Sequence, residues 1–150
     1  MVVVYYLADQ IQDVLLEHEK KGYITFINAG KFFKTATYLK EIKQYLEDPF
    51  MVVNGDTLTN LDLNDFIEFH LTNRNIATVF TKHDAIRTGG SYVFDKEVLK
   101  YIKPDMDIPD LMQFLIDQNI PINIYRSEAR YFDIGTEDKL KLARKFYEKT

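Results

Sequence analysis

The 150-residue sequence contains no cysteine and no tryptophan. The missing cysteines exclude a disulfide framework and thiolate chemistry, and they fit a reducing compartment, so we expect a cytoplasmic protein. Long hydrophobic runs are also missing. The apolar start at residues 1–6 is too short to span a membrane, and no basic residue precedes it, so the run predicts neither a transmembrane helix nor a signal peptide.

The sequence has no strong excess of charge of one sign. Its net charge is −4, which gives no general attraction to nucleic acid or to an anionic membrane, and we expect neither as a partner. The hydrophobic fraction of 46% is ordinary for a globular protein. Residues 1–150 are long enough to bury one substantial core, so we predict a single domain. Because the chain opens directly on a strand-like run, we expect a segment to be missing upstream.

Short β-branched and aromatic runs alternate with segments of helical periodicity. This alternation predicts a three-layer α/β fold with a mostly parallel, Rossmann-like sheet. Thr35 or Thr37, Asn64 and Thr136 are expected to cap helices. Strands are predicted at residues 2–6, 23–27, 50–53, 76–81, 91–94, 122–125 and 130–132, and helices at 7–18, 35–46, 64–71, 96–102, 109–117 and 136–147.

Two aspartates each follow a predicted strand. Asp56 comes after residues 50–53 and Gly55, which lets the backbone turn sharply, and Asp133 ends the strand at 130–132. Ligands of such folds bind outside the carboxyl ends of the strands, where one or two carboxylates and substrate phosphates commonly hold Mg²⁺. If the two side chains converge, they form a metal-assisted phosphoryl or nucleotidyl transfer site. If they do not, each merely closes a turn, and the spacing leaves both possibilities open.

Other polar and flexible positions carry weaker signals. Gly89 and Gly90 precede a strand, which is typical either of close approach to a sugar or phosphate or of a bulge. The histidines show no metal-like spacing, and His18 and His70 fall in helical patterns where we expect partial exposure. Lys139 belongs to a lysine-rich helix face that we interpret as solvated.

Three motifs occur in a recognisable order. They are Phe-Met-Val-Val-Asn-Gly-Asp-Thr at 50–57, Thr-Gly-Gly-Ser-Tyr-Val-Phe at 88–94 and Tyr-Phe-Asp-Ile-Gly-Thr at 131–136. Together they resemble the sugar-1-phosphate nucleotidyltransferases, the enzymes that make nucleotide-sugars. The resemblance spans nearly the whole chain and implies a fold of the nucleotide-diphospho-sugar transferase type.

The resemblance also implies roles for individual residues. Asp56 and Asp133 would bind Mg²⁺ together and form the catalytic pair. Gly90 would contact the sugar, and Thr35 lies where the family meets the nucleotide base. The implied partners are a sugar 1-phosphate and a nucleotide, either an NTP or an NDP-sugar. The substrate-binding residues implied in this way are Thr35, Gly55, Thr88, Gly89, Gly90 and Gly135.

Two parts of the family pattern are missing. The glycine-rich Gly-X-Gly-Thr-Arg loop that wraps the triphosphate is absent, and the stretch ending in Glu-Lys-Pro is lost between Thr81 and Thr88. The chain therefore resembles a family member that is incomplete at its N-terminus and shortened internally. Losing one such charge-stabilising donor costs about 10²–10³ in rate, so we expect almost no activity from the chain alone.

The incomplete pattern leaves several possibilities for partners and function. An upstream complementing chain would restore the missing loop, and an exposed strand edge favours either such a partner or a homo-oligomer. An alternative is a non-catalytic sugar-phosphate-binding or regulatory module of the same fold. A further alternative is an unrelated flavodoxin-like α/β domain with coincidental turns.

Overall fold

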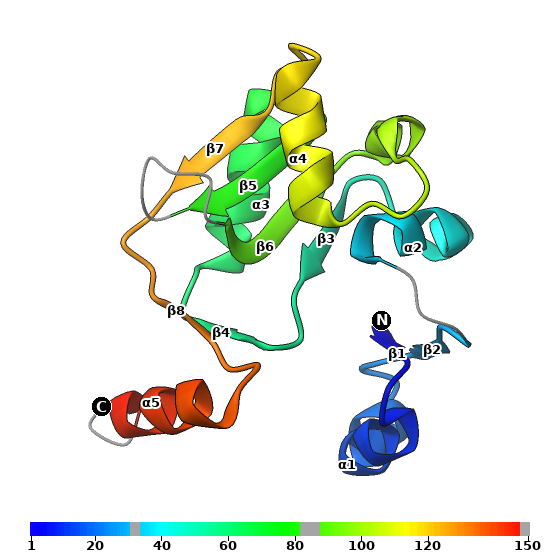
Figure 1. Cartoon of the computed structure of the whole chain (residues 1–150), viewed down its shortest axis with the longest axis vertical. Coiled ribbons are helices and arrows are strands. Elements are labelled where there is room, and N and C mark those ends of the chain that lie inside the picture. The colour runs from blue at the N-terminus through cyan, green and yellow to red at the C-terminus, as the bar shows by residue number, and fades with distance from the viewer. Residues whose placement is uncertain (31–33, 82–87, 148–150) are drawn as a thin grey trace.

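The computed structural model describes residues 1–30, 34–81 and 88–147. Each predicted strand and helix is present within a few residues, and one additional strand, β4, appears (Figure 1). No helix in these three ranges is long and apolar enough to cross a membrane. The strands are β1 (Val2–Val4), β2 (Phe26–Asn28), β3 (Phe50–Val53), β4 (Thr57–Thr59), β5 (Ala77–Thr81), β6 (Thr88–Phe94), β7 (Asn123–Arg126) and β8 (Tyr131–Asp133). The helices are α1 (Ala8–Lys20), α2 (Thr35–Glu41), α3 (Leu63–Asn73), α4 (Ile108–Asp117) and α5 (Glu137–Tyr147), with short 3₁₀ helices η1 (Lys43–Tyr45) and η2 (Lys96–Tyr101).

The main sheet has four strands in the order β3-β6-β5-β7. Strand β6 is antiparallel to both β3 and β5, and β5 is parallel to β7. The α/β fold class is confirmed. Strands β3, β5 and β7 run in one direction, as expected for a mostly parallel sheet, and only β6 runs against them, which makes the sheet mixed. Only residues 82–87 separate β5 from β6, and a parallel crossover needs about a dozen residues, so β6 returns in the opposite direction.

Helices cover both faces of this sheet, which gives three layers. In Figure 1, α3 lies behind β5 and β6, and α4 lies in front of them. Alternate strand residues point to opposite faces: Val79 and Tyr92 join the core under α2 and α4, whereas Phe80 and Val93 join the core under α3. The sheet is therefore buried on both faces and forms a rigid base for its strand ends.

The helix caps agree only partly with the sequence. Thr136 caps α5, because its hydroxyl accepts from the amide of Lys139 at 3.4 Å. The cap of α3 is Asp62 and not Asn64: the Asp62 carboxylate accepts from the Asn64 amide at 2.9 Å. Helix α2 begins at Thr35, and the residue before it, Lys34, forms no side-chain cap. Neither Thr35 nor Thr37 is therefore the N-cap of this helix.

His70 on α3 is buried, with 2% of its surface exposed, so the expectation of partial exposure is wrong. It lies one turn after the fully buried Phe66, on the helix face that packs against the sheet. Its ring nitrogens bind Thr78 Oγ1 at 2.7 Å and Asp95 Oδ1 at 3.0 Å. The two bonds satisfy a polar side chain that would otherwise be costly to bury.

Strands β1 and β2 form a separate two-stranded parallel sheet joined by α1. In Figure 1 this unit lies at one end of the molecule, beside β3 and α2. Within the described ranges, β1 pairs with no strand of the main sheet. Helix α1 leaves Ile11, Val14 and Leu16 exposed, so much of its apolar surface has no cover in the described part of the chain.

Candidate active site

The two motif aspartates are brought together by the antiparallel pair β4–β8. Thr57 lies opposite Asp133 in this ladder, so Asp56, the residue before Thr57, is next to the end of β8. The ladder continues past Asp133, because the Ile134 amide donates to the Asp56 carbonyl at 2.7 Å. Backbone pairing between segments far apart in the sequence therefore fixes the two residues side by side.

The two carboxylates converge on Gly135. A methyl group on its Cα would lie 3.2 Å from Asp133 Oδ1 and 3.2 Å from Asp56 Oδ2. Because both oxygens lie 3.2 Å from the same point beside Gly135, the distance between Asp133 Oδ1 and Asp56 Oδ2 is at most twice 3.2 Å. The Gly135 amide also donates to Asp133 Oδ1 at 2.9 Å, which orients this carboxylate. The convergence that the sequence left open is present in the structure.

Lys139 on α5 joins this pair of carboxylates. Its ammonium Nζ donates to Asp133 Oδ2, and its side chain stays half exposed, so the lysine is solvated as expected and in addition has an acidic partner. The bond from Lys139, together with the Gly135 amide, lowers the pKa of Asp133 below its ordinary value. The lysine lies on the first turn of α5, three residues after the cap Thr136, and nothing in the sequence distinguishes it from the other lysines of that helix.

We expect Lys139→Met to raise the pKa of Asp133 toward its ordinary value, because the largest cause of the lowering is removed. A lowered carboxyl pKa stabilises the folded chain above the unfolded pKa, and this contribution is lost as the pH falls through the folded pKa. The variant should therefore lose less stability on acidification. A carbon-detected NMR titration of the Asp133 carboxyl measures the pKa. Lys141→Met is the control, since Lys141 faces Glu137 at 3.8 Å, and an unchanged Asp133 titration in Lys139→Met would contradict the assignment.

Gly89 and Gly90 lie against the same region of the molecule. Gly90 has a φ of 70°, and a methyl group there would lie 2.8 Å from Thr57 Oγ1. A methyl group on Gly89 would overlap the ring of Phe80. The β5–β6 register also shifts between Val79 and Thr81, so the bulge considered from the sequence is present. Packing thus accounts for both glycines, and their contact with substrate stays a prediction.

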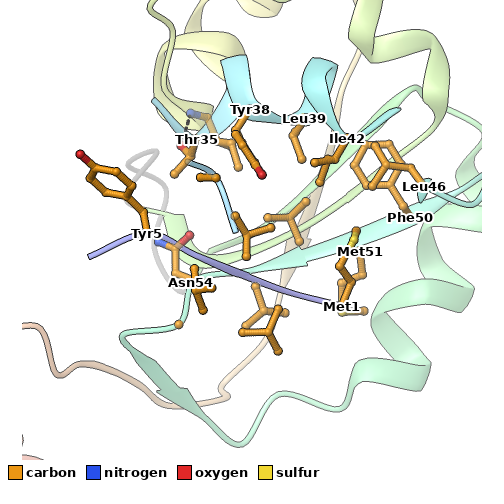
Figure 2. A pocket seen from close by; sticks show the side chains of 18 of the residues that line it. Met1, Tyr5, Thr35, Tyr38, Leu39, Ile42, Leu46, Phe50, Met51 and Asn54 are labelled. Atoms are coloured by element: carbon orange, nitrogen blue, oxygen red, sulfur yellow. Dashed lines mark hydrogen bonds between the residues drawn. The ribbon is translucent and has the colours of Figure 1, made fainter. Parts of the chain in front are cut away.

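The remaining predicted residues are more widely spread. Gly55 is exposed next to Asp56, and Thr88 opens β6 opposite Thr81. Thr35 lies on the wall of a pocket, shown in Figure 2, that also contains Asn54, Gly55 and Asp56. Its hydroxyl donates to Asp107 Oδ1 at 3.3 Å and accepts from the Ile108 amide at 3.2 Å. The structure therefore groups Gly55, Asp56, Asp133, Gly135 and Gly90 closely and places Thr35 across the pocket.

The donor set fits one hard cation whose coordination is completed by substrate. Asp56 and Asp133 are both exposed at the surface. In the described ranges, no cluster of three or more histidine, cysteine or acidic side chains suited to a metal exists. A structural zinc ion needs about four nitrogen or sulfur ligands, whereas Mg²⁺ is commonly held by one or two carboxylates plus phosphates and water. The chemistry of the pair fits Mg²⁺ with a phosphorylated ligand.

Two proteins are similar in sequence to this chain. It is 24% identical over 184 residues to a UTP–glucose-1-phosphate uridylyltransferase from Synechocystis sp., a match that covers 90% of this chain and 47% of the relative. It is 31% identical over 68 residues to the bifunctional protein GlmU of Methanocaldococcus jannaschii, covering 45% of this chain and 16% of that protein. No family model matches the sequence. The chain thus spans about half the length of the first relative and less of the second.

Solved structures show the same fold. A glucose-1-phosphate thymidylyltransferase from Bacillus anthracis, solved with a sucrose, has a TM-score of 0.74 at 17% identity and covers 91% of this chain and 71% of its own. HddC from Yersinia pseudotuberculosis complexed with GMP-PN has a TM-score of 0.73 at 21% identity, covering 96% and 77%. The fold is therefore of the nucleotide-diphospho-sugar transferase type.

The resemblance indicated by the three motifs is confirmed: the chain is similar in sequence to the sugar-1-phosphate nucleotidyltransferases. The alignment to the Synechocystis relative is longer than the 150 residues of this chain. That relative therefore carries additional residues inside the aligned region, which agrees with the internal shortening expected from the sequence.

Proposed function

We propose that this chain is the metal- and sugar-phosphate-binding part of a nucleotidyltransferase that joins a nucleotide to a sugar 1-phosphate in the cytoplasm. The observation that carries the proposal is the convergence of Asp56 and Asp133 beside Gly135. Both aspartates belong to motifs that resemble those of the family, and the β4–β8 ladder holds them in one place. The similarity to the Synechocystis uridylyltransferase supports the same reaction class.

In this proposal Asp56 and Asp133 hold Mg²⁺ through their carboxylate oxygens. Bound Mg²⁺ supplies positive charge that neutralises phosphate oxygens during nucleotidyl transfer. Gly135 keeps the space between the carboxylates free of a side chain, and its amide fixes the orientation of Asp133. Lys139 holds one oxygen of Asp133 and is placed to meet a phosphate once a cation takes over that carboxylate.

The other proposed contacts surround this centre. Gly90 lies against Thr57 at the start of β4 and would present its backbone to the sugar. Thr35 would approach the nucleotide from the far wall of the pocket. We propose that the chain binds these ligands but turns them over only with a complementing segment, because the described residues supply Lys139 as the one cation bonded to the aspartate pair.

Titration calorimetry and a pyrophosphate-release assay test this proposal together. The chain should bind glucose 1-phosphate only with Mg²⁺ present and should release almost no pyrophosphate from NTPs by itself. Mixing it with a polypeptide that carries the glycine-rich triphosphate loop should produce turnover with at least one pairing of NTP and sugar 1-phosphate. The control ligand is glucose, which lacks the phosphate.

The outcomes separate the possible functions. Absence of Mg²⁺-dependent binding to any sugar phosphate or nucleotide would contradict the proposal as a whole. Binding without turnover in the mixture would favour the alternative, a regulatory module that keeps the sugar-phosphate face. Turnover by the chain alone would show that no complementing segment is needed.

A further inference from the structure

An apolar pocket of about 720 Å³ separates the two-stranded sheet from the main sheet. Strand β1 forms one wall and β3 the other, as Figure 2 shows, and Leu39, Ile42 and Leu46 cover it from the side of α2. We call this space the β1–β3 slot. It carries no charged side chain along the two strands, and its polar lining is limited to Asn54–Asp56, Thr35 and the tyrosine hydroxyls. A charged ligand in the slot would therefore meet no oppositely charged side chain over most of the length of the slot.

Both walls of the slot are strand edges that lack a partner in the described ranges. Strand β3 is the terminal strand of the main sheet, and β1 pairs only with β2. In the parallel β1–β2 pair, the Val2 amide donates to the Thr25 carbonyl at 2.8 Å, and the Val4 carbonyl accepts from the Ala29 amide at 2.8 Å. Because peptide groups alternate along a strand, those of Val3 point to the opposite edge, into the slot.

The same alternation applies to β3. The Asn54 amide donates to the Gly90 carbonyl at 2.8 Å, one step beyond the paired residues Val53 and Ser91. In an antiparallel ladder, hydrogen-bonded residue pairs alternate with pairs that are not hydrogen-bonded. Because Asn54 is in a bonded pair, Val53 and Met51 are in non-bonded pairs, and their peptide groups point away from β6. Peptide groups from Val3, Met51 and Val53 therefore face the slot from two sides.

A folded second copy of this chain is a poor occupant of the slot. A strand that fits between β1 and β3 uses both of its edges, and each strand of the described ranges already has at least one edge paired. The occupant must instead be an extended segment without strand partners of its own. Its side chains must be apolar, because they would lie among Leu39, Ile42 and the valines of β1.

We propose that the β1–β3 slot binds an extended apolar segment of another polypeptide by β-strand addition. In Figure 2, β1 runs from Met1 to Tyr5 in the same direction as β3 runs from Phe50 to Asn54, and a parallel strand between them joins the two sheets into one. The carboxyl end of that strand lies next to Asn54–Asp56. This proposal says how the complementing segment of the proposed function would bind to the chain. The observations that support it are those of the β1–β3 slot alone.

The test uses the full chain and a synthetic peptide of alternating valine and isoleucine flanked by lysines. Binding is followed by fluorescence anisotropy, and amide hydrogen exchange locates the bound peptide by NMR. We expect saturable binding and slowed exchange at Val3, Met51 and Val53. The same peptide with alternate amides N-methylated should not bind, because it cannot donate to both edges.

A pair of variants makes the result specific to backbone pairing. Val3→Pro removes one amide that faces the slot and should weaken peptide binding about tenfold, which corresponds to one hydrogen bond of ordinary strength. Val3→Leu keeps that amide and should bind like the parent. Circular dichroism and unchanged exchange in β5 and β6 show that both variants are folded.

Several results would overturn the proposal. The first two are that the peptide does not bind and that the N-methylated peptide binds equally well. The other two are that the peptide slows amide exchange only on α1, and that the amides of Val3, Met51 and Val53 are already protected by self-association without peptide. None of these four results depends on Mg²⁺ or glucose 1-phosphate. The binding of these two ligands is measured separately on the same samples. Loss of sugar-phosphate binding with intact peptide binding would count against the proposed function alone.

Discussion

Asp56→Asn and Asp133→Asn should each weaken Mg²⁺-dependent binding of glucose 1-phosphate by roughly 10- to 100-fold. Each substitution keeps the shape of the side chain but removes one of two negative charges, and an interaction with a charged group is worth about 1.5–3 kcal/mol. Both side chains are exposed, so the fold should tolerate the change. Titration calorimetry with and without Mg²⁺ measures the loss directly.

The double variant tests whether the two residues act as one unit. If they hold the same cation, combining the substitutions should cost clearly less than the sum of the two separate free-energy losses. Asp138→Asn is the matched control: it removes the same charge from α5, and its side chain is 98% exposed beside Lys141. Additive losses in the double variant, or an equal loss in the control, would show that general electrostatic attraction and not a shared site explains the binding.

The fold was largely predictable because its strands and helices carry clear local patterns. The run at β3 (Phe50–Val53) is continuous and apolar, and it was predicted with its observed bounds. Strand β4 (Thr57–Thr59) was missed because three residues directly after a turn show no usable alternation. That short strand is what places Asp56 beside Asp133, so their convergence was not predictable from spacing.

Other features depended on tertiary contacts that the sequence does not show. Lys139 looked like one of several surface lysines, and only the approach of α5 to β8 reveals its bond to Asp133. His70 looked like an exposed helix residue, and its burial follows from which face of α3 meets Thr78. In each case the helix was predicted from its periodicity, while the partner came from another part of the chain.

A second large effect is expected from Gly90→Ala, which should destabilise the chain by about 2 kcal/mol. Gly90 has a φ of 70°, a conformation that costs a residue with a Cβ about 1–2 kcal/mol. The added methyl group would also lie 2.8 Å from Thr57 Oγ1 and 3.3 Å from Asn54 Nδ2. Crowding of this kind typically adds a further 1–3 kcal/mol unless the neighbours move, so part of the strain should be relieved by a shift of the turn.

Gly55→Ala is the control, because no atom lies within 4 Å of its added methyl group and its φ is not positive. Its unfolding free energy should stay within about 0.5 kcal/mol of the parent in urea titrations. The shift caused by Gly90→Ala would displace the Asn54–Thr57 turn, which carries Asp56, so Mg²⁺-dependent glucose 1-phosphate binding should weaken together with stability. If Gly90→Ala lowers stability but leaves that binding unchanged, Gly90 supports the fold without positioning Asp56, and if it changes neither, the close packing of Gly90 on Thr57 is wrong.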